Sequence, residues 1–395
     1  MRPLAEELAA WAVEFDSRDD DRELARRALV DTVAVAVAAR SEPVTRLACK
    51  CLEESAAWAT AAHALDYDDL HMPSTSHISA VCVPAALAAG GGERAYLAGA
   101  GVMARLGTAL GWAHYRRGWH ATCTAGALAA AVTAGVAAGL DAGRLAVALA
   151  LAVPAAGGVQ RSFGTMAKPL QVGFAVAAGR RAALLAASGA SADITALDEW
   201  FALVGGSRER FTTAGSVVPG RLAIKVYPCC YALQRPIAAT ATLAVPVAEV
   251  ERIVCRTPAG ALQPLIHSAP RTGLEAKFSL EYGVAAALLD RPVGFASFTD
   301  DCVRRPEAQR LAALVAVEAQ PGGEGLLEGE FQVTVHLRGG RQAEGVLDLP
   351  PGAPGRPPSP AELRQKVADC CGEAAGEVMD LSWASAPDLL RHTLG

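Results

Sequence analysis

Residues 61–77 of this chain, AAHALDYDDLHMPSTSH, combine side chains that can move protons. The segment holds three of the eight histidines and three aspartates, namely His63, His71, His77, Asp66, Asp68 and Asp69. The sequence on both sides is rich in alanine and uncharged, as expected for buried helices. Titratable groups in an apolar environment have shifted pKa values, which proton-transfer catalysts need. The segment therefore predicts an acid–base site more than a solvated loop.

A second group of polar residues surrounds the sequence YRRGW. His114 and His120 flank this sequence, and Thr122 and Thr124 follow it where we expect a helix to begin. Backbone amides at the start of a helix can bind an anion. The segment therefore predicts a histidine beside an anion-binding position.

Two lysines and one tyrosine stand alone in otherwise apolar sequence. They are Lys168 in GTMAKPLQVG, Lys225 in IKVYPCCYALQ and Tyr282 in AKFSLEYGVAAALL. A lone lysine usually extends along the surface, and a lone tyrosine in a helix usually belongs to the core. Two lysines that meet acid–base residues in one pocket would instead bind a substrate with several carboxylates. They would also stabilise the charge that develops when His or Asp removes a proton beside a carboxylate.

The elements that must position these residues change character along the chain. Helical spacing of apolar residues predicts helices at about 21–39, 79–89, 94–114, 124–140 and 143–157. After about residue 240, Val250–Arg256 and Phe331–Leu337 alternate and are rich in β-branched residues, so we expect strands there. Gly339-Gly340 predicts a hairpin turn after the second strand, and 276–289 predicts a further helix.

We expect a mainly α fold with a large all-helical domain over 1–239 and a smaller α+β lid domain over 240–358. A C-terminal helical segment, 359–395, should return to the helical domain. It begins at the capping box Ser359–Glu362, with proline at the first helical position. A chain of 395 residues exceeds what one hydrophobic core usually organises, so two domains are the default expectation.

Composition excludes several classes of protein. The net charge of −5 and the lack of a basic stripe argue against nucleic-acid binding. The ten cysteines contain no CxxC pair, so we expect reduced thiols in a cytoplasmic protein, and the first residues do not form a secretory signal. Residues 121–140 are uncharged and long enough to span a bilayer, but they are Ala, Gly and Thr more than Leu or Ile. We therefore expect a buried helix there and no membrane.

Several motifs, in this order, resemble those of the MmgE/PrpD family, whose members include 2-methylcitrate dehydratase, cis-aconitate decarboxylase and iminodisuccinate epimerase. The motifs span nearly the whole chain and read ARRALVDTVAVAVA, HALDYDDLH…SH, GWHATCTAG, MAKPLQVG, IKVYPCC and AKFSLEYGVAAALLD. The resemblance implies a helical domain with an α+β lid, a homodimer, and an active site in the cleft without metal or other cofactor. By motif matching, the active-site positions of the family fall on Asp66, His77, His120, Lys168, Lys225 and Tyr282.

Three positions depart from the pattern of the family where its members contact substrate. Leu70 follows DYDD where many members have Thr, and Gln234 stands where a His is common. Cys230 stands where the decarboxylase would have a His, although a Cys pair is itself frequent in the family. These departures bear on the identity of the substrate more than on the fold.

The leading hypothesis is a cofactor-independent lyase for a small di- or tricarboxylic acid. His120, or the Asp66/His77 pair, would remove a proton alpha to a carboxylate. Lys168 and Lys225 would hold carboxylates, and Tyr282 or a protonated His would assist the leaving group. We expect dehydration, as in 2-methylcitrate dehydratase, from its frequency in the family. Decarboxylation of a cis-aconitate-like acid and epimerisation of an iminodisuccinate-like acid share the same proton transfer.

Two other classes of function compete with the lyase. The six titratable residues of 61–77 are compatible with a divalent metal, as in a metal-dependent hydrolase, but no HExxH-like spacing occurs. A binding protein without catalysis is suggested by Leu70 and Gln234, and the retained lysines and His120 argue against it.

Overall fold

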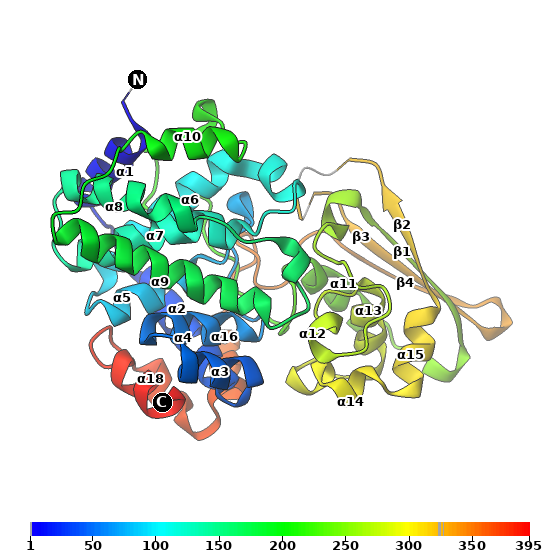
Figure 1. Cartoon of the computed structure of the whole chain (residues 1–395). Coiled ribbons are helices and arrows are strands. Elements are labelled where there is room, and N and C mark those ends of the chain that lie inside the picture. Colours follow the sequence, from blue (N-terminus) through cyan, green and yellow to red (C-terminus); the bar gives the residue numbers. More distant parts are fainter. Residues whose placement is uncertain (1, 323–324, 327) are drawn as a thin grey trace. The chain divides into compact units, whose positions relative to one another are not determined.

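The computed structural model describes residues 2–322, 325–326 and 328–395, and the chain divides into two compact units (Figure 1). The first, which we call the helical unit, contains the residues up to Arg161, Ala167–Leu222 and Ser359–Gly395. The second, the mixed unit, contains Ser162–Met166 and Ala223–Pro358. The predicted mainly α fold, with a large helical part and a smaller α+β part, is confirmed.

The helical unit is built around a central alanine-rich helix. In chain order its helices are α1 (Leu4–Glu14), α2 (Asp19–Ala38), α3 (Pro43–Cys51), α4 (Glu54–Ala64), α5 (Ile78–Ala88), α6 (Glu93–Arg116), α7 (Ala121–Ala137), α8 (Ala142–Ala152), α9 (Ala167–Ala187), α10 (Ala196–Leu203), α16 (Pro360–Cys371), α17 (Ala375–Met379) and α18 (Ala386–Leu394). Helix α7 packs against α5, α6, α8 and α9, and its residues are buried from Ala121 to Gly135. This burial explains the uncharged stretch at 121–140.

Glycines let the backbone of α9 lie directly against the backbones of its neighbouring helices. A Cβ added at Gly179 would lie 2.4 Å from the carbonyl oxygen of Ala127 on α7. A Cβ added at Gly173 would lie 2.7 Å from the carbonyl oxygen of Ala56 on α4. Real Cβ atoms do not approach this closely, so α9 can sit where it does only with glycine at both positions.

Helix α9 is also the one helix in the described part of the chain that could cross a membrane by length and composition alone. Half of its apolar window is buried inside the structure, and core helices of soluble proteins meet the same criterion. The observation is therefore weak evidence for a membrane span.

The mixed unit consists of a four-stranded sheet and short helices. Its strands are β1 (Val250–Pro258), β2 (Val315–Gln320), β3 (Phe331–Leu337) and β4 (Gln342–Leu347), in the order β2-β1-β3-β4. β1 and β2 are parallel, and the other pairs are antiparallel. The predicted strands at β1 and β3 and the hairpin turn are confirmed, and Gly339 and Gly340 both have positive φ. The sequence analysis missed β2 and β4.

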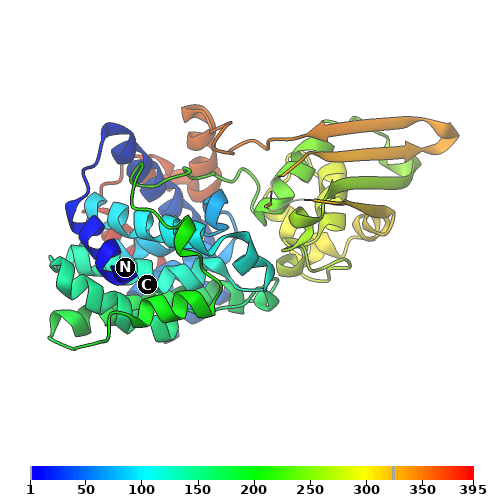
Figure 2. The ribbon, with the colours of Figure 1, turned by 90° about the horizontal axis from the view of Figure 1, so that it is seen from above.

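Helices cover one face of this sheet (Figure 2). They are α11 (Tyr231–Ala241), α12 (Gly273–Ala276), α13 (Leu280–Leu289), α14 (Asp300–Val303) and α15 (Pro306–Ala313). Helix α11 packs against α13, β3 and β4, so residues 223–239, which we expected in the helical domain, group with the mixed unit. The helix predicted over 276–289 is interrupted before Ser279, whose side chain caps α13 by accepting from the Tyr282 amide.

The C-terminal segment adds a buried ion pair to the helical unit. The predicted capping box is confirmed, because Ser359 and Glu362 exchange hydrogen bonds of 2.7 and 3.2 Å. From α16, which packs on α2, the Lys366 ammonium lies 2.7 Å from Asp31 of α2. It also donates to the backbone carbonyl of Tyr67 at 2.9 Å.

Candidate active site

The acid–base segment is the loop that joins α4 to α5. It follows His63 in the last turn of α4, and His77 is the residue immediately before α5. Asp66 adopts left-handed backbone angles, with a φ of 54°, which aspartate tolerates better than most residues. The whole stretch from Ala61 to His71 is buried, so the titratable side chains of this loop must find partners inside the protein.

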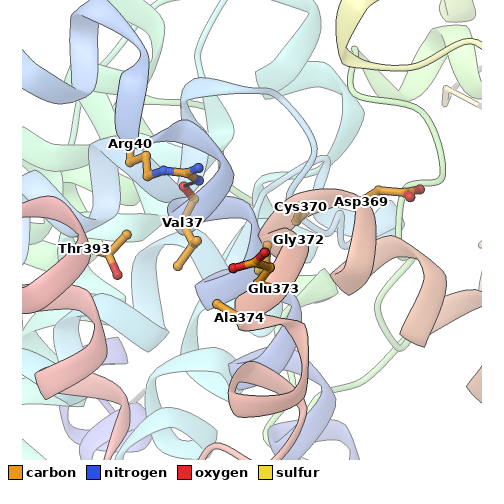
Figure 3. A pocket seen from close by; sticks show the side chains of 9 residues that line it. Val37, Arg40, Asp369, Cys370, Gly372, Glu373, Ala374 and Thr393 are labelled. Carbon is orange, nitrogen blue, oxygen red and sulfur yellow. Dashed lines mark hydrogen bonds between the residues drawn. The ribbon is translucent and has the colours of Figure 1, made fainter.

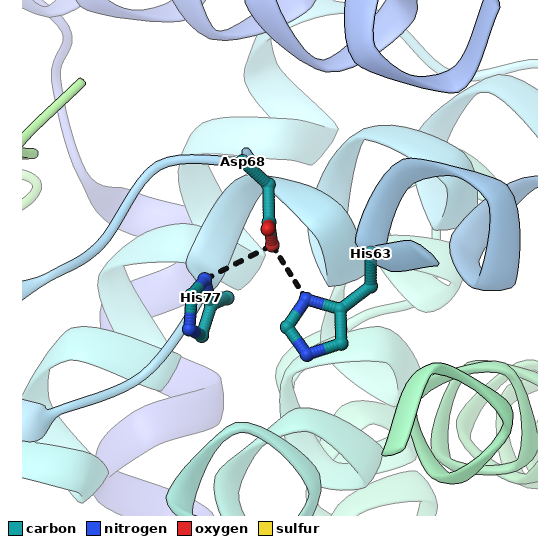
Figure 4. A group of neighbouring side chains, drawn as sticks. All are labelled: His63, Asp68 and His77. Atoms are coloured by element: carbon teal, nitrogen blue, oxygen red, sulfur yellow. Dashed lines mark hydrogen bonds and ion pairs between the residues drawn. The ribbon is translucent and has the colours of Figure 1, made fainter. Parts of the chain in front are cut away.

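Asp68 lies at the centre of the cluster and accepts from two imidazoles (Figure 4). Its Oδ2 is 2.7 Å from His63 Nδ1 and 3.0 Å from His77 Nδ1. Burial raises the pKa of Asp68, but the electrostatic attraction of the His63 and His77 imidazoles and the N–H groups that they donate outweigh burial, so the pKa lies well below its usual value. Asp68 is therefore an ionised carboxylate inside the protein.

Lys168, in the first turn of α9, extends this chain of contacts. Its Nζ lies 3.2 Å from Asp66 Oδ1 and 2.8 Å from His63 Nε2. An ammonium group only donates, so His63 Nε2 accepts and His63 Nδ1 carries the proton that is donated to Asp68. Burial, with the charge of Lys168, lowers the pKa of His63 despite the nearby carboxylates. His63 is thus a neutral imidazole with a defined tautomer.

His120 completes the cluster from the start of α7. Its ring stacks on that of His63 with centroids 5.7 Å apart, and its Nδ1 is 3.2 Å from Cys123 Sγ. Burial and the charges of Lys168, His63 and His77 hold its pKa well below the usual value. The backbone amide of His77 donates to Thr122 Oγ1 at 3.1 Å. The N-termini of α5 and α7 therefore meet at the cluster, where their dipoles favour negative charge.

Two titratable residues of the loop face elsewhere. His71 Nδ1 lies 2.7 Å from Ser74 Oγ, its Nε2 contacts the carbonyl of Pro219, and burial lowers its pKa to about 4. Asp69 accepts from the amide and hydroxyl of Ser79, and its pKa rises to about 7 because of burial and, less, because of nearby carboxylates. Both residues hold the loop in shape, so the six-residue metal set considered from the sequence is not assembled.

The smaller set His63, Asp68 and His77 still places three possible metal ligands within 4.8 Å of one another. The Lys168 contact argues against a metal ion there. Because Lys168 donates to His63 Nε2, the proton of His63 occupies Nδ1, the nitrogen that would have to bind the ion. A metal would require this buried contact to break, so these residues fit a hydrogen-bonded cluster better than a metal centre.

The other predicted site residues belong to the mixed unit. Lys225 is fully buried. The Tyr282 hydroxyl donates to the carbonyl of Ser297, and burial raises its pKa to about 12. Cys230 precedes α11, and the Gln234 amide oxygen accepts from the backbone amides of Val226 and Tyr227 at 3.0 Å each. Gln234 thus stabilises the turn after Lys225.

The structure therefore brings together four of the six predicted catalytic residues, Asp66, His77, His120 and Lys168, and Leu70 is buried in the same loop. The sequence analysis counted His63 and Asp68 in the acid–base segment and in the metal set but not among the six catalytic residues, although they join the cluster into one network. Their spacing gave a signal: a histidine at the end of a helix followed five residues later by an aspartate allows one turn to bring them together. His114 bonds to Val204 O and Thr124 Oγ1, away from this network.

A separate pocket of about 560 Å³ lies beside α2 and the C-terminal helices (Figure 3). Arg40 lines it and donates to the carbonyl of Val37. Burial raises the pKa of both thiols of Cys370 and Cys371, so neither is activated as a nucleophile. No histidine or lysine of the loop cluster lines this pocket.

Family models match most of the chain. The MmgE/PrpD N-terminal domain matches residues 6–204, which include the whole cluster, and the MmgE/PrpD C-terminal domain matches residues 227–384. The chain belongs to the MmgE/PrpD family. This family includes lyases such as dehydratases, which supports lyase chemistry at a coarse level. Lys225 lies between the two matched ranges, whereas Tyr282 lies inside the second. No match to a curated protein was found.

Proposed function

We propose that this protein is a cofactor-independent lyase that removes a proton alpha to a carboxylate of a small di- or tricarboxylic acid, with dehydration as the reaction. One observation carries the proposal: the buried Lys168 ammonium is held between Asp66 and His63, beside two further histidines. A fixed cation supplies both a binding point for a carboxylate and stabilisation of the charge that develops as the proton leaves.

His77 is the base that the cluster supports best. A base works best when its pKa lies near the operating pH, and the strongly lowered pKa of His120 makes that residue a weak base. The ionised Asp68 orients the His77 ring through Nδ1 and would stabilise the imidazolium that forms. We assign to His120 hydrogen bonding to the substrate, and to protonated His77 the assistance of the leaving hydroxyl.

Lys225 and Tyr282 enter the proposal through the family motifs. Lys225 would bind a second carboxylate of the substrate. The Tyr282 proton is already donated to Ser297 and its pKa is raised, so we assign to Tyr282 a structural contribution in preference to acid catalysis. We also propose that the protein is a homodimer, which light scattering after size-exclusion chromatography would test.

An NMR screen of di- and tricarboxylates in heavy water tests the proposal. We expect loss of an alpha-proton signal together with formation of an unsaturated acid. Exchange without net conversion would instead identify an epimerase, and release of CO₂ would identify a decarboxylase. A protein with stoichiometric metal whose activity is lost on chelation would support the hydrolase alternative.

Lys168→Ala should lower turnover by about a thousandfold, since electrostatic groups of this kind contribute on that order. The melting temperature should also fall, because Asp66 is left buried without its cation, so turnover is measured at a temperature where circular dichroism shows the variant to be folded. Lys50→Ala is the matched control, since Lys50 is the exposed lysine of the chain and should be neutral. Wild-type turnover in Lys168→Ala would contradict the proposal.

A further inference from the structure

His63 lies between two oppositely charged groups and contacts both. Its Nδ1 is 2.7 Å from the Asp68 carboxylate, and its Nε2 is 2.8 Å from the Lys168 ammonium. The side chain is fully enclosed, so solvent does not reach it. Asp66, His77 and His120 are the other titratable groups that surround it.

The two neighbours leave His63 one arrangement of its proton. The lysine can only donate and the ionised carboxylate can only accept, so Nε2 is the acceptor and Nδ1 is the donor. The opposite tautomer would set two donors against each other at Lys168 and two acceptors against each other at Asp68. His63 therefore acts as a polar connector of fixed direction between the loop carboxylate and the lysine.

We infer that His63 is a positioning residue that fixes the Lys168 ammonium beside Asp66, in the orientation that the substrate meets. This inference rests on the proposed function. The lysine side chain has four rotatable bonds, so each acceptor that its ammonium meets narrows the positions that the ammonium can take. The second acceptor, His63 Nε2, is itself held in place by Asp68. The resulting chain, Asp66–Lys168–His63–Asp68–His77, couples the proposed base to the proposed carboxylate anchor.

The rarity of lysine in this chain, and its burial, support a specific requirement for an ammonium group at position 168. Only five of the 36 lysine and arginine residues are lysines. Four of these five are buried, namely Lys168, Lys225, Lys277 and Lys366. A compact ammonium can donate hydrogen bonds in several directions, whereas the guanidinium of arginine donates within one plane. In this chain lysine therefore occurs mainly at buried positions, and at position 168 the ammonium contacts Asp66 and His63.

Packing is the competing explanation for His63, because its ring also stacks on His120 and meets the edge of His77. Two substitutions separate the explanations. A glutamine places its terminal amide at about the position of imidazole Nε2, so His63→Gln retains an acceptor for Lys168. An asparagine reaches only the position of Nδ1, so His63→Asn retains the donor to Asp68 and loses the acceptor for Lys168. Neither variant retains the ring.

Turnover should separate the two variants. We expect His63→Asn to lower kcat by about 100-fold, the effect of a displaced catalytic group, with KM changed less than about threefold. His63→Gln should retain kcat within about tenfold of wild type, since one hydrogen bond of ordinary strength is at stake. Equal losses in both variants, or no loss in either, would overturn the inference.

A spectroscopic measurement on the full chain tests the inference without relying on activity. With lysine labelled in ¹³C and ¹⁵N, the five lysines give five side-chain signals, and Lys168→Ala identifies the signal of Lys168. In His63→Asn this signal should shift, and its ammonium hydrogens should exchange with water about tenfold faster, because an acceptor is lost. In His63→Gln it should stay close to the wild-type position.

The two measurements distinguish a failure of the role inferred for His63 from a failure of the proposed function. A Lys168 signal that is identical in wild type, His63→Asn and His63→Gln overturns the role of His63, whatever the activity. A signal that shifts only in His63→Asn, in a wild-type protein that exchanges no alpha proton of any carboxylic acid tested, supports the role of His63 and removes the proposed function.

Discussion

At the scale of residues, the adjacent aspartates Asp68 and Asp69 differ in charge because they differ in neighbours. Asp68 receives N–H groups from two imidazoles, which holds its pKa well below the usual value. Asp69 receives only the amide and hydroxyl of Ser79, and burial beside Asp31 and Asp68 raises its pKa to about 7. The environment, and not the residue type, thus places one carboxylate in the histidine–lysine cluster and the other among the contacts that hold the loop in shape.

Asp69 should make the protein less stable as the pH rises. An unfolded aspartate loses its proton near pH 3.8 and folded Asp69 near 7, so its contribution to stability is present below pH 3.8 and is lost as the pH rises through 7. In urea unfolding, the free energy of unfolding of Asp69→Asn should rise by about 4 kcal/mol relative to that of wild type between pH 3.5 and pH 8. Parallel curves for the two proteins would contradict the assigned protonation state.

His71 should have the opposite effect over nearly the same pH range. Its folded pKa of about 4 lies below the usual 6.5, so its contribution is present above pH 6.5 and is lost as the pH falls through 4. His71→Gln should therefore lose stability relative to wild type as the pH rises from 4 to 7, by about 3 kcal/mol. The same urea titration measures this change, and a difference between the two proteins that does not vary with pH would contradict the lowered pKa of His71.

At the scale of elements, α16 supports the loop between α4 and α5 from the far end of the chain. Lys366 pairs with Asp31 of α2 and donates to the backbone of Tyr67, which lies between Asp66 and Asp68. The three groups are held inside the helical unit, so the loop conformation depends on a helix about 300 residues away in sequence. A long loop with several buried charges needs such backbone anchors to keep one conformation.

Lys366→Met should destabilise the protein by about 3–5 kcal/mol, because Asp31 is left buried without its cation. Adding Asp31→Val should restore most of the melting temperature, since removing both members of a buried pair costs much less. The double variant still lacks the bond to the Tyr67 carbonyl, so we expect its kcat to stay about tenfold low. Thermal denaturation with a turnover assay measures both effects, and full activity in the double variant would assign Lys366 to stability alone.

At the scale of the whole molecule, the predicted catalytic residues are divided between the two compact units. The cluster around Lys168 belongs to the helical unit, whereas Lys225 belongs to the mixed unit. Lys225→Ala should therefore raise KM for a polycarboxylate by at least about tenfold, the effect expected when a charged hydrogen bond to the substrate is lost. An unchanged KM in steady-state kinetics, with Lys50→Ala as control, would contradict a contact between Lys225 and the substrate.

The sequence predicted the fold class, five helices of the helical unit and the start of α16, two strands and a hairpin, because these follow from local periodicity. It did not predict α9, where Pro169 stands in the first turn, a position at which a helix tolerates proline. It missed β2, whose residues are half-exposed and carry little alternation. The contact of Lys168 with His63 joins residues 105 positions apart, so it depends on how α9 packs against α4, which no local pattern encodes.

The close packing of α7 and α9 has a consequence for how new specificities could arise on this scaffold. Larger side chains cannot enter where Gly179 lies against the backbone of α7, so the segment that presents His120 is unable to reshape itself by small steps. Under the proposed function, adaptation to a different acid would proceed more readily through Leu70 or Cys230, which lie outside that interlocked pair. Directed evolution confined to α7 should thus yield mostly unfolded clones, whereas libraries of apolar residues of similar size at these two buried positions should retain more folded clones.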